Sequence, residues 1–185
     1  LRKNLRDPMP IKLLQKLVGS EVLAVERRAK YLIIKTSQGG ILSHLGMTGS
    51  WRVVEKKSQH ENIAHDHVEI YLSDGKVLIY NDPRRFGMFE TIDIAAIEEN
   101  PRLKSLGPEP FSAEFDAKYL KQQLSSRKTA IKAVIMDQKV VVGVGNIYAS
   151  EVLFQIGISP SKNAAKLSLS QCEQGRPPRR REHDA

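Results

Sequence analysis

A loop in the second half of the chain combines residue types that hold anions. Residues 141–146 include two glycines and lead directly into an apolar stretch with helical character. Backbone amides in a glycine-rich turn, together with the start of a helix, favour a negatively charged ligand. A dinucleotide site would need a third glycine where Tyr148 stands, and a βαβ setting that is missing. The loop and Asn146 are therefore predicted to hold a phosphate, and a tight turn between packed helices is the alternative.

Residues 82–87 place two guanidinium groups beside an aromatic ring. Arginine donates hydrogen bonds in a fork to phosphates and base edges, and a phenylalanine can wedge into a base step. Arg84 and Phe86 therefore suit a protein that opens a DNA duplex. A solvated hairpin with one buried phenylalanine is the simpler interpretation.

Residues 44–50 hold Met47 between Gly46 and Gly49. Glycines on either side let the backbone turn sharply, so that a side chain that would otherwise be buried can face solvent. An exposed Met47 is one hypothesis for this loop. A methionine in the core is the other.

Lys30 and a group of histidines could also act on an anionic ligand. Lys30 lies in an otherwise apolar run, where a desolvated lysine can transfer a proton or bind phosphate, although it can also simply mark a strand end. His65 and His67 could share one strand face and bind a metal, but no cysteine or convincing carboxylate set accompanies them. A phosphate contact or a structural role is expected for these histidines and for His60.

Two kinds of elements are expected to position these residues. Short runs with strand chemistry, separated by turn signals at 37–40 and 73–75, predict an antiparallel sheet or sandwich in which consecutive strands pair as hairpins. The predicted strands are 21–26, 31–35, 41–44, 51–55, 68–72, 77–80 and 88–92. A short helix over 94–97, capped by Asp93, is predicted to follow.

The second half is predicted to be mainly helical. Three prolines and a glycine in 101–110 mark a connector. Helices are predicted from Ser112 to about residue 125, from Thr129 to about residue 138, and from Asn146 to near residue 157, each capped by its first residue. The predicted fold class is α+β, with an antiparallel β-sandwich domain at 1–100, a linker at 101–111, a helical domain at 112–173 and a basic disordered tail at 174–185.

The composition favours an anionic partner. The 185 residues include 29 Lys and Arg against 21 Asp and Glu, which gives a net charge of +8. Cys172 is the single cysteine, so the sequence has neither an internal disulfide nor a cysteine-based zinc site, and it fits a reducing compartment. No apolar run reaches the roughly 18 to 20 residues of a membrane span. A cytoplasmic protein without a membrane partner is expected.

Six segments, in this order, closely resemble bacterial formamidopyrimidine-DNA glycosylase: 27–31, 44–50, 65–68, 82–87, 106–110 and 143–151. The resemblance covers about residues 10 to 173. It implies a base-excision repair enzyme that removes oxidised purines from DNA and then cuts the strand at the abasic site. It also implies a sandwich domain, a helix-two-turn-helix domain and a zinc finger.

The resemblance implies a gap-filling role for three residues. Met47, Arg84 and Phe86 match the side chains that occupy the space left when the damaged nucleotide is flipped out, and Arg84 faces the orphaned base. This set separates the family from its relative endonuclease VIII, which acts on oxidised pyrimidines and fills the gap differently. A purine enzyme is expected, and an endonuclease VIII-like enzyme is the alternative.

Four other residues match residues that meet the DNA strand. Lys30 matches a lysine that donates a proton during strand cleavage and contacts phosphate. His65, Lys128 and Asn146 match contacts to the DNA backbone, and Asn146 does so at a helix start where an anion is favoured. The implied partner is double-stranded DNA containing oxidised purines or abasic sites, bound by a monomer.

The chain departs from the family pattern at both ends. The family's nucleophile is the amine of an N-terminal proline followed by a glutamate, whereas Leu1 stands first here. Pro8 and Pro10 are internal, so their nitrogens are amides without a basic lone pair. After Glu173 the four-cysteine zinc finger has no counterpart, and no cofactor is expected. These departures predict a truncated, inactive enzyme, with a non-catalytic DNA-binding fragment or an unstable product as alternatives.

Overall fold

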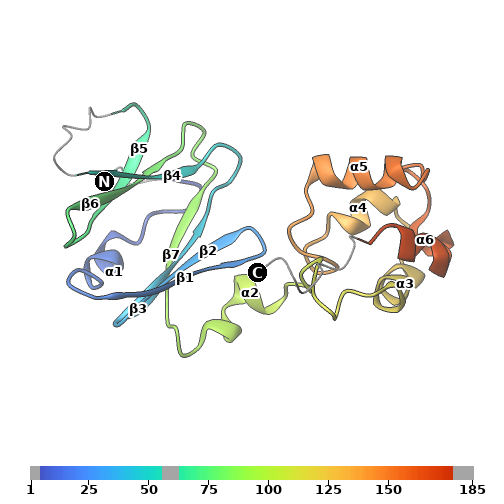
Figure 1. The fold of residues 1–185 in the computed structure, drawn as a ribbon, viewed down its shortest axis with the longest axis horizontal. Coiled ribbons are helices and arrows are strands. Elements are labelled where there is room, and N and C mark those ends of the chain that lie inside the picture. The colour runs from blue at the N-terminus through green and yellow to red at the C-terminus, as the bar shows by residue number, and fades with distance from the viewer. Residues whose placement is uncertain (1–4, 56–62, 177–185) are drawn as a thin grey trace. The chain divides into compact units, whose positions relative to one another are not determined.

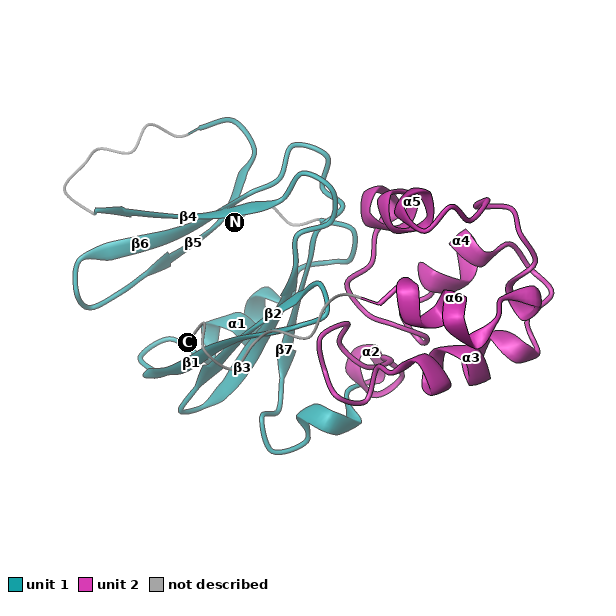
Figure 2. Ribbon diagram, turned by 45° about the vertical axis from the view of Figure 1, so that its right-hand side comes forward, with its two compact units in different colours: residues 1–100 teal, residues 101–185 magenta. Residues whose placement is uncertain are grey.

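The computed structural model of the chain describes residues 5–55 and 63–176. The chain divides into two compact units, Leu1–Asn100 and Pro101–Ala185, which Figure 2 shows in separate colours. None of the helices in the described ranges is long and apolar enough to cross a membrane. Each unit has its own hydrophobic core.

The first unit consists of two antiparallel sheets and a short helix (Figure 1). One sheet has the strand order β1-β2-β3-β7 and the other has the order β4-β6-β5. The elements of this unit are α1 Ile11–Gln15, β1 Val22–Arg28, β2 Tyr31–Thr36, β3 Gly39–His44, β4 Ser50–Glu55, β5 Asp66–Tyr71, β6 Lys76–Asn81, β7 Met88–Ile92 and the 3₁₀ helix η1 Ile97–Glu99.

Each predicted strand is present, but the pairing is only partly local. The predicted hairpins β1–β2, β2–β3 and β5–β6 form. The expectation that all consecutive strands pair is wrong, because β3 pairs with β7 and β4 pairs with β6. The reason lies in residues 45–49, which carry the chain from one sheet to the other instead of turning back along β3.

The core of the first unit lies between the two sheets. Ile34, Ile41 and Phe89 enter it from one sheet, and Val68 and Tyr80 enter it from the other. The rings of Tyr80 and Phe89 meet edge to face at 4.8 Å between centroids, a geometry that stabilises aromatic pairs beyond their burial alone. Because apolar side chains of both sheets fill one layer, the unit is the predicted antiparallel sandwich.

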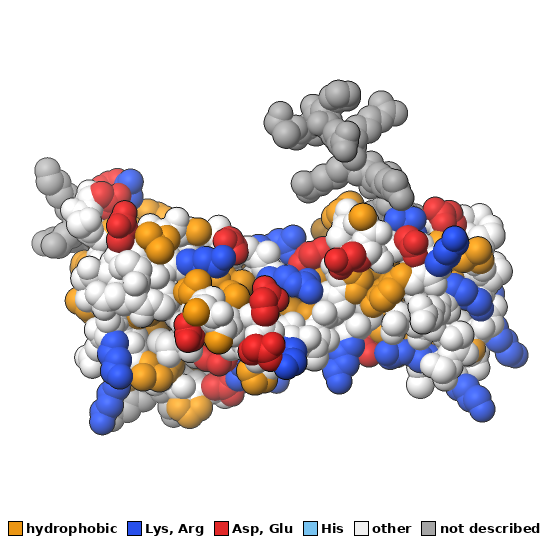
Figure 3. Space-filling view, turned by 90° about the horizontal axis from the view of Figure 1, so that it is seen from below, with side chains coloured by type: hydrophobic (Ala, Val, Ile, Leu, Met, Phe, Trp, Pro, Cys, Tyr) orange, Lys and Arg blue, Asp and Glu red, His pale blue; other side chains and the backbone are white. Residues whose placement is uncertain are grey.

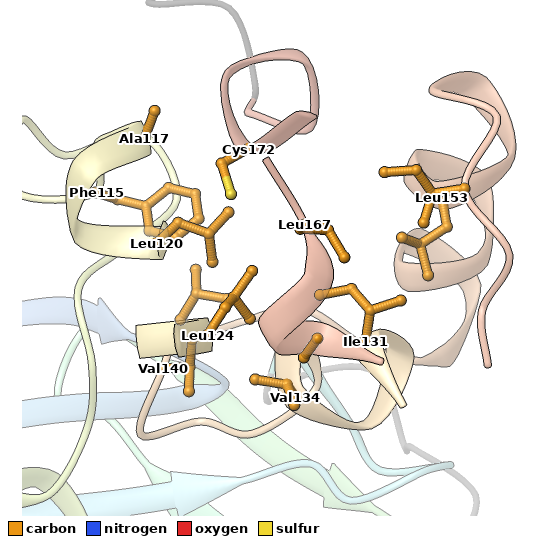
Figure 4. Close-up of a cluster of buried hydrophobic side chains, with 13 residues drawn as sticks. Phe115, Ala117, Leu120, Leu124, Ile131, Val134, Val140, Leu153, Leu167 and Cys172 are labelled. Atoms are coloured by element: carbon orange, nitrogen blue, oxygen red, sulfur yellow. The ribbon is translucent and has the colours of Figure 1, made fainter. Parts of the chain in front are cut away.

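The second unit is helical, which confirms the α+β class. Its elements are α2 Pro101–Lys104, α3 Ala117–Ser125, α4 Ile131–Ile135, α5 Asn146–Gln155, the 3₁₀ helix η2 Ala164–Lys166 and α6 Leu169–Gln174. Figure 4 shows the buried side chains that these elements direct toward one another. Leu120 and Leu124 are one helical turn apart, so both face the core, where they join Leu153 and Cys172.

Two predicted helix starts are wrong. The helix predicted from Ser112 begins at Ala117, because the carboxylate of Asp116 accepts the backbone N–H of Tyr119 at 2.6 Å and caps it there. The helix predicted from Thr129 begins at Ile131. Residue Ala130, which precedes it, forms an antiparallel bridge with Asn163 and is therefore extended.

Three smaller differences concern connecting segments. Asp93 does accept the backbone N–H of Ala95 at 2.9 Å, but a turn follows, and the 3₁₀ helix starts only at Ile97. The proline-rich connector contains the short helix α2. Gly145 precedes α5 as its cap, so Asn146 is its first helical residue and not its cap. The predicted tail at 174–185 lies outside the described residues from position 177 onward.

Candidate nucleic-acid interface

Two loops of the first unit are joined by the side chain of Asp82. The Met47 loop, residues 45–49, follows β3, and the Phe86 loop, residues 83–87, follows β6. The hydroxyl of Thr48 donates to one carboxylate oxygen of Asp82 at 2.6 Å, and the backbone N–H of Gly87 donates to the other at 2.8 Å. The N–H of Arg84 also donates to the hydroxyl oxygen of Thr48 at 3.3 Å. The two loops therefore lie side by side.

Glycines allow this close approach. A Cβ atom on Gly46 would lie 2.5 Å from the backbone carbon of Phe86, and one on Gly87 would overlap the hydroxyl of Tyr80. Real Cβ atoms do not come this close to other atoms, so neither position accepts a side chain without movement of the backbone or of the core. Gly46 also has a φ of +66°, which favours glycine independently of the crowding.

The joined loops present apolar side chains and a cation to solvent. Met47 is 70% exposed and Phe86 is 43% exposed, so the alternatives of a core methionine and a buried phenylalanine are wrong. The guanidinium carbon of Arg84 lies 4.7 Å from the centroid of the Phe86 ring, within the range of a cation–π contact. Exposed apolar groups next to forked donors can enter a base stack and donate to a base edge.

Asp82 itself is fully buried beneath the loops. Burial alone would raise the pKa of its carboxyl, but the hydrogen bonds from Thr48, Gly87 and Tyr80 outweigh burial and lower that pKa below its ordinary value. Burial, together with the nearby Asp82 charge, raises the pKa of Tyr80. Asp82, which joins the two loops, is therefore an ionised carboxylate surrounded by hydrogen-bond donors.

His65 lies at the start of β5 in an unusual backbone conformation. Its φ is +75°, a region that residues other than glycine rarely adopt, and its side chain is exposed. Its carbonyl accepts the N–H of Asp82 at 3.1 Å. On either side, the amide of Asn81 donates to the carbonyl of Ala64 at 2.9 Å and to the carboxylate of Asp66 at 2.8 Å.

His67 behaves differently from His65. Its ring is buried, and its Nε2 lies 2.8 Å from the carbonyl oxygen of Asp82, so this nitrogen must donate. Within 5–55 and 63–176, no three His, Cys, Asp or Glu side chains come together in a way that could hold a metal ion. The hypothesis that His65 and His67 bind a metal from one strand face therefore gains no structural support, and His60 lies outside the described residues.

Lys30 is exposed at the turn between β1 and β2. The preceding Ala29 has a φ of +54°, and its carbonyl accepts a hydrogen bond from the Arg27 guanidinium at 2.8 Å. The following Tyr31 pairs with His44 across the sheet, and His44 is the last residue before the Met47 loop. Lys30 is therefore positioned at the sheet end from which that loop emerges.

In the second unit, the predicted glycine loop leads into α5. Gly143 has a φ of +79°, and its N–H donates to the side-chain oxygen of Gln138 at 3.0 Å. The amide of Gln138 donates in turn to the carbonyl of Val144 at 3.3 Å. Asn146 is exposed at the first position of α5, where backbone N–H groups have no partner inside the helix. This arrangement suits an anion.

Lys128 is exposed on the segment between α3 and α4. The residues on both sides of it are fixed, because the carbonyl of Arg127 accepts the N–H of Ala165 at 3.1 Å and that of Thr129 accepts the N–H of Ala164 at 3.0 Å. Because the backbone on both sides is fixed, only the side chain of Lys128 has to be ordered when it meets a phosphate. On the face in Figure 3, basic side chains are interspersed with acidic ones.

Some residues at these sites were not predicted from the sequence. Ile147 is 70% exposed and Tyr148 is 66% exposed on α5, and neither of them was assigned a role from the sequence. Lys132 also reaches this helix, because its Nζ donates to the hydroxyl of Ser150 at 2.8 Å. For Ile147 and Tyr148, the position of an aromatic residue close after the predicted phosphate loop was the only feature of the sequence that could have indicated a role.

The first unit thus presents an apolar wedge with an arginine, and the second unit presents backbone amides at a helix start and, on the segment before α4, the exposed Lys128. Together these features define a class of protein: a two-domain nucleic-acid-binding protein with a β-sandwich and a helical domain. Sequence models of known families agree. The formamidopyrimidine-DNA glycosylase N-terminal domain matches residues 1–89, and the formamidopyrimidine-DNA glycosylase H2TH domain matches residues 106–175.

Individual relatives lead to the same family. A formamidopyrimidine-DNA glycosylase of Bdellovibrio bacteriovorus is 49% identical over 169 residues, which cover 91% of this chain and 61% of that protein. The Lactococcus lactis enzyme bound to DNA with an AP site superposes with a TM-score of 0.82 at 32% identity, covering 90% of this chain and 64% of that one.

A MutM protein in complex with DNA containing carbocyclic 8-oxo-G has a TM-score of 0.81 at 34% identity, covering 89% of this chain and 62% of that one. The chain belongs to the formamidopyrimidine-DNA glycosylase family, and it spans about three fifths of the length of these relatives.

Proposed function

We propose that the chain recognises damaged sites in double-stranded DNA and serves the excision of oxidised purines. The observation that carries this proposal is the pair of loops joined through Asp82, which presents Met47 and Phe86 to solvent with Arg84 on the Phe86 ring. The related Lactococcus and MutM proteins were solved with DNA that contains an AP site and carbocyclic 8-oxo-G, respectively.

The proposed recognition step fills a gap in the duplex. When a nucleotide leaves the stack, its neighbours lose a stacking partner and the opposite base loses its hydrogen bonds. Met47 and Phe86 offer apolar surface to the neighbours, and Arg84 offers forked donors to the orphaned base. The fixed separation of the two loops lets these three side chains enter together.

Four residues would hold the sugar-phosphate backbone during this step. His65 and Lys30 are exposed on the first unit, and Lys128 and Asn146 are exposed on the second. A cationic or amide donor at each position would neutralise or hydrogen-bond one phosphate. For Lys30, we propose a further role as a proton donor during strand cleavage.

The proposal is tested by fluorescence anisotropy with three duplexes that are identical except at one position. One duplex carries a tetrahydrofuran abasic analogue, one carries an oxidised guanine, and one is undamaged. We expect tighter binding to the first two, with log affinity falling linearly as log salt rises. A duplex with an oxidised pyrimidine at the same position separates a purine preference from the endonuclease VIII-like alternative.

Arg84→Ala provides the decisive variant, with Arg102→Ala as its control. Arg102 is also an exposed arginine, but it lies on α2 of the second unit. Arg84→Ala should weaken binding to the damaged duplexes more than binding to the undamaged one, by roughly tenfold. Equal losses on damaged and undamaged DNA would contradict a gap-filling role.

The chemistry is tested separately from recognition. Incubating the chain with the oxidised-guanine duplex and borohydride traps any Schiff base between a protein amine and the sugar. A trapped adduct would show that the chain itself carries a reactive amine, and Lys30→Met would then show whether Lys30 takes part. Damage-specific binding without an adduct would assign recognition alone to these 185 residues.

A further inference from the structure

The end of β6 meets three loops that carry proposed DNA contacts. β6 is the central strand of its sheet, and its last residue, Asn81, pairs with Ser50 on one side and Asp66 on the other. Ser50 directly follows the Met47 loop, and Asp66 directly follows His65. The Phe86 loop continues from β6 itself. The sheet topology therefore brings all three loops to residues 81 and 82.

Asp82 is hydrogen-bonded to each of these loops. Its carboxylate accepts from Thr48 of the Met47 loop and from Gly87 of the Phe86 loop. Its backbone N–H donates to the carbonyl of His65 at 3.1 Å, and its own carbonyl accepts the N–H of Arg85 at 3.3 Å. One buried residue thus fixes the separation of the gap-filling loops.

The side chain of Asn81 acts on one loop only. Its side-chain amide donates to the carbonyl of Ala64 and to the carboxylate of Asp66, the two neighbours of His65. The guanidinium of Arg52 makes a two-pronged contact with the same carboxylate. Because His65 has a φ of +75°, which is rarely populated, hydrogen bonds on both of its sides are needed to keep it there.

We propose that Asn81 and Asp82 are positioning residues with separate tasks: the Asp82 carboxylate sets the gap-filling side chains, and the Asn81 amide sets His65. This inference rests on the proposed function of the chain in binding damaged DNA. Neither side chain needs to touch DNA, because Asp82 is buried and Asn81 is half-buried beneath the loops. The two residues are neighbours in sequence, yet their loss should produce different defects.

Asp82→Asn tests the first task. The substitution keeps the size of the side chain but replaces one acceptor oxygen with a donor, which would face the N–H of Gly87 or the hydroxyl of Thr48. The preference for the abasic-analogue duplex over the undamaged duplex should fall roughly tenfold. Binding to undamaged DNA should change by less than about twofold, as it should for the surface control Asp74→Asn.

Asn81→Ala tests the second task. The variant should weaken binding to damaged and undamaged duplexes by the same factor, because His65 is proposed to contact a phosphate and not a base. The preference for the abasic analogue should stay unchanged. This pattern is the opposite of that expected for Asp82→Asn. A single cooperative urea transition must accompany it, because partial unfolding would also weaken binding to both duplexes equally.

Thr48→Val keeps the inference testable if Asp82→Asn does not fold. Thr48 is exposed, so the fold should tolerate valine, but the hydroxyl that donates to Asp82 is lost. Thr48→Val should reduce the preference for the abasic-analogue duplex over the undamaged duplex, as Asp82→Asn does. Where both variants fold with one cooperative urea transition, the double variant should lose no more than either alone, because both remove one interaction.

A fluorescent 2-aminopurine beside the abasic analogue reports insertion directly. At saturating protein, its fluorescence should change with the wild type and with Asn81→Ala, and should change much less with Asp82→Asn. If the wild type shows no preference for damaged DNA, the proposed function fails. If the wild type shows the preference and both Asp82→Asn and Thr48→Val retain it in full, the positioning inference alone is overturned.

Discussion

The end of β6 in the first unit and the glycine loop of the second unit prepare for DNA in different ways. At β6, a buried carboxylate holds two loops so that three side chains point outward. In the second unit, the side chain of Gln138 holds the loop that leads into the first turn of α5, where backbone N–H groups have no partner inside the helix. The first arrangement depends on which side chains are present. The second depends mainly on the path of the backbone.

The largest effect of this difference is expected on stability, when a glycine of each region is replaced by alanine. Gly87→Ala would drive a Cβ into the Tyr80 hydroxyl and to 2.9 Å from the His44 carbonyl. It should destabilise the first unit by about 3 kcal/mol, since the overlap is with the core. Gly143→Ala meets no atom within 4 Å and should cost only about 1 to 2 kcal/mol, from its positive φ.

Urea unfolding of both alanine variants measures this contrast, and Gly143→Asn provides a control. Asparagine tolerates a positive φ better than alanine does, so Gly143→Asn should be the milder change at that position. Gly87→Asn should not be milder than Gly87→Ala, because the cost at this position comes from steric overlap and not from a positive φ. A larger loss for Gly143→Ala than for Gly87→Ala would reverse the comparison.

Acid provides a second way to separate the two regions. The pKa of Asp82 is lower in the folded protein than its unfolded value of about 3.9, so its stabilising contribution is complete above that value. The contribution is lost as the pH falls through the lower, folded pKa. Asp82→Asn removes this group and replaces a charged acceptor of three hydrogen bonds with a neutral amide, at a cost of about 1 to 3 kcal/mol at neutral pH.

The measurement is the free energy of unfolding between about pH 7 and pH 3. The wild type should lose more stability across this range than Asp82→Asn does, so the two curves should converge in acid. Asp137 of the second unit also has a lowered pKa, because the N–H of Lys139 and the guanidinium of Arg127 favour its charged form. Asp137→Asn is the matched comparison. If the free energy of unfolding of the wild type and of Asp82→Asn fell in parallel with pH, Asp82 would not be the ionised residue that joins the two loops.

The strands could be predicted from the sequence, whereas their long-range pairing could not. Alternating apolar residues and turn signals depend on neighbouring residues, and β7 has the predicted bounds of Met88–Ile92. The pairing of β3 with β7 depends on where the chain changes sheets, and no local pattern encodes that change. The start of α4 was missed for a similar reason, since Ala130 is held extended by the distant Asn163.

The side chains of the site show the same division. The types of Arg84 and Phe86 suited DNA chemistry, whereas for Met47 the sequence left exposure and burial open. The close packing of Gly46 against Phe86, which accompanies the exposure of these side chains, is not encoded locally. Asp82 was visible in the sequence as the first residue of its motif, with no role attached. Its role comes from burial and from a partner, Thr48, that is distant in sequence and therefore not encoded locally.

A smaller effect on stability and DNA binding is expected at Gln138, whose side chain holds the glycine loop of the second unit. Gln138→Ala removes the acceptor for the Gly143 N–H and the donor to the Val144 carbonyl. It should cost about 1 kcal/mol of stability, and it should weaken binding to damaged and undamaged duplexes equally, because backbone amides carry no base specificity. Gln122→Ala on the exposed part of α3 is the control. A selective loss on damaged DNA would mean that this loop reads the lesion.

The smallest effect is expected at Lys128, and it sharpens the comparison most directly. Lys128→Ala removes one exposed cation from a segment whose backbone is fixed on both sides, so the fold should be unaffected. If Lys128 meets one phosphate, log affinity against log salt should become shallower by about one, identically for damaged and undamaged duplexes. Lys118→Ala, an exposed lysine on α3, should leave the slope unchanged. A changed lesion preference in Lys128→Ala would place side-chain readout in the second unit as well, and the division of labour between the two regions would then be wrong.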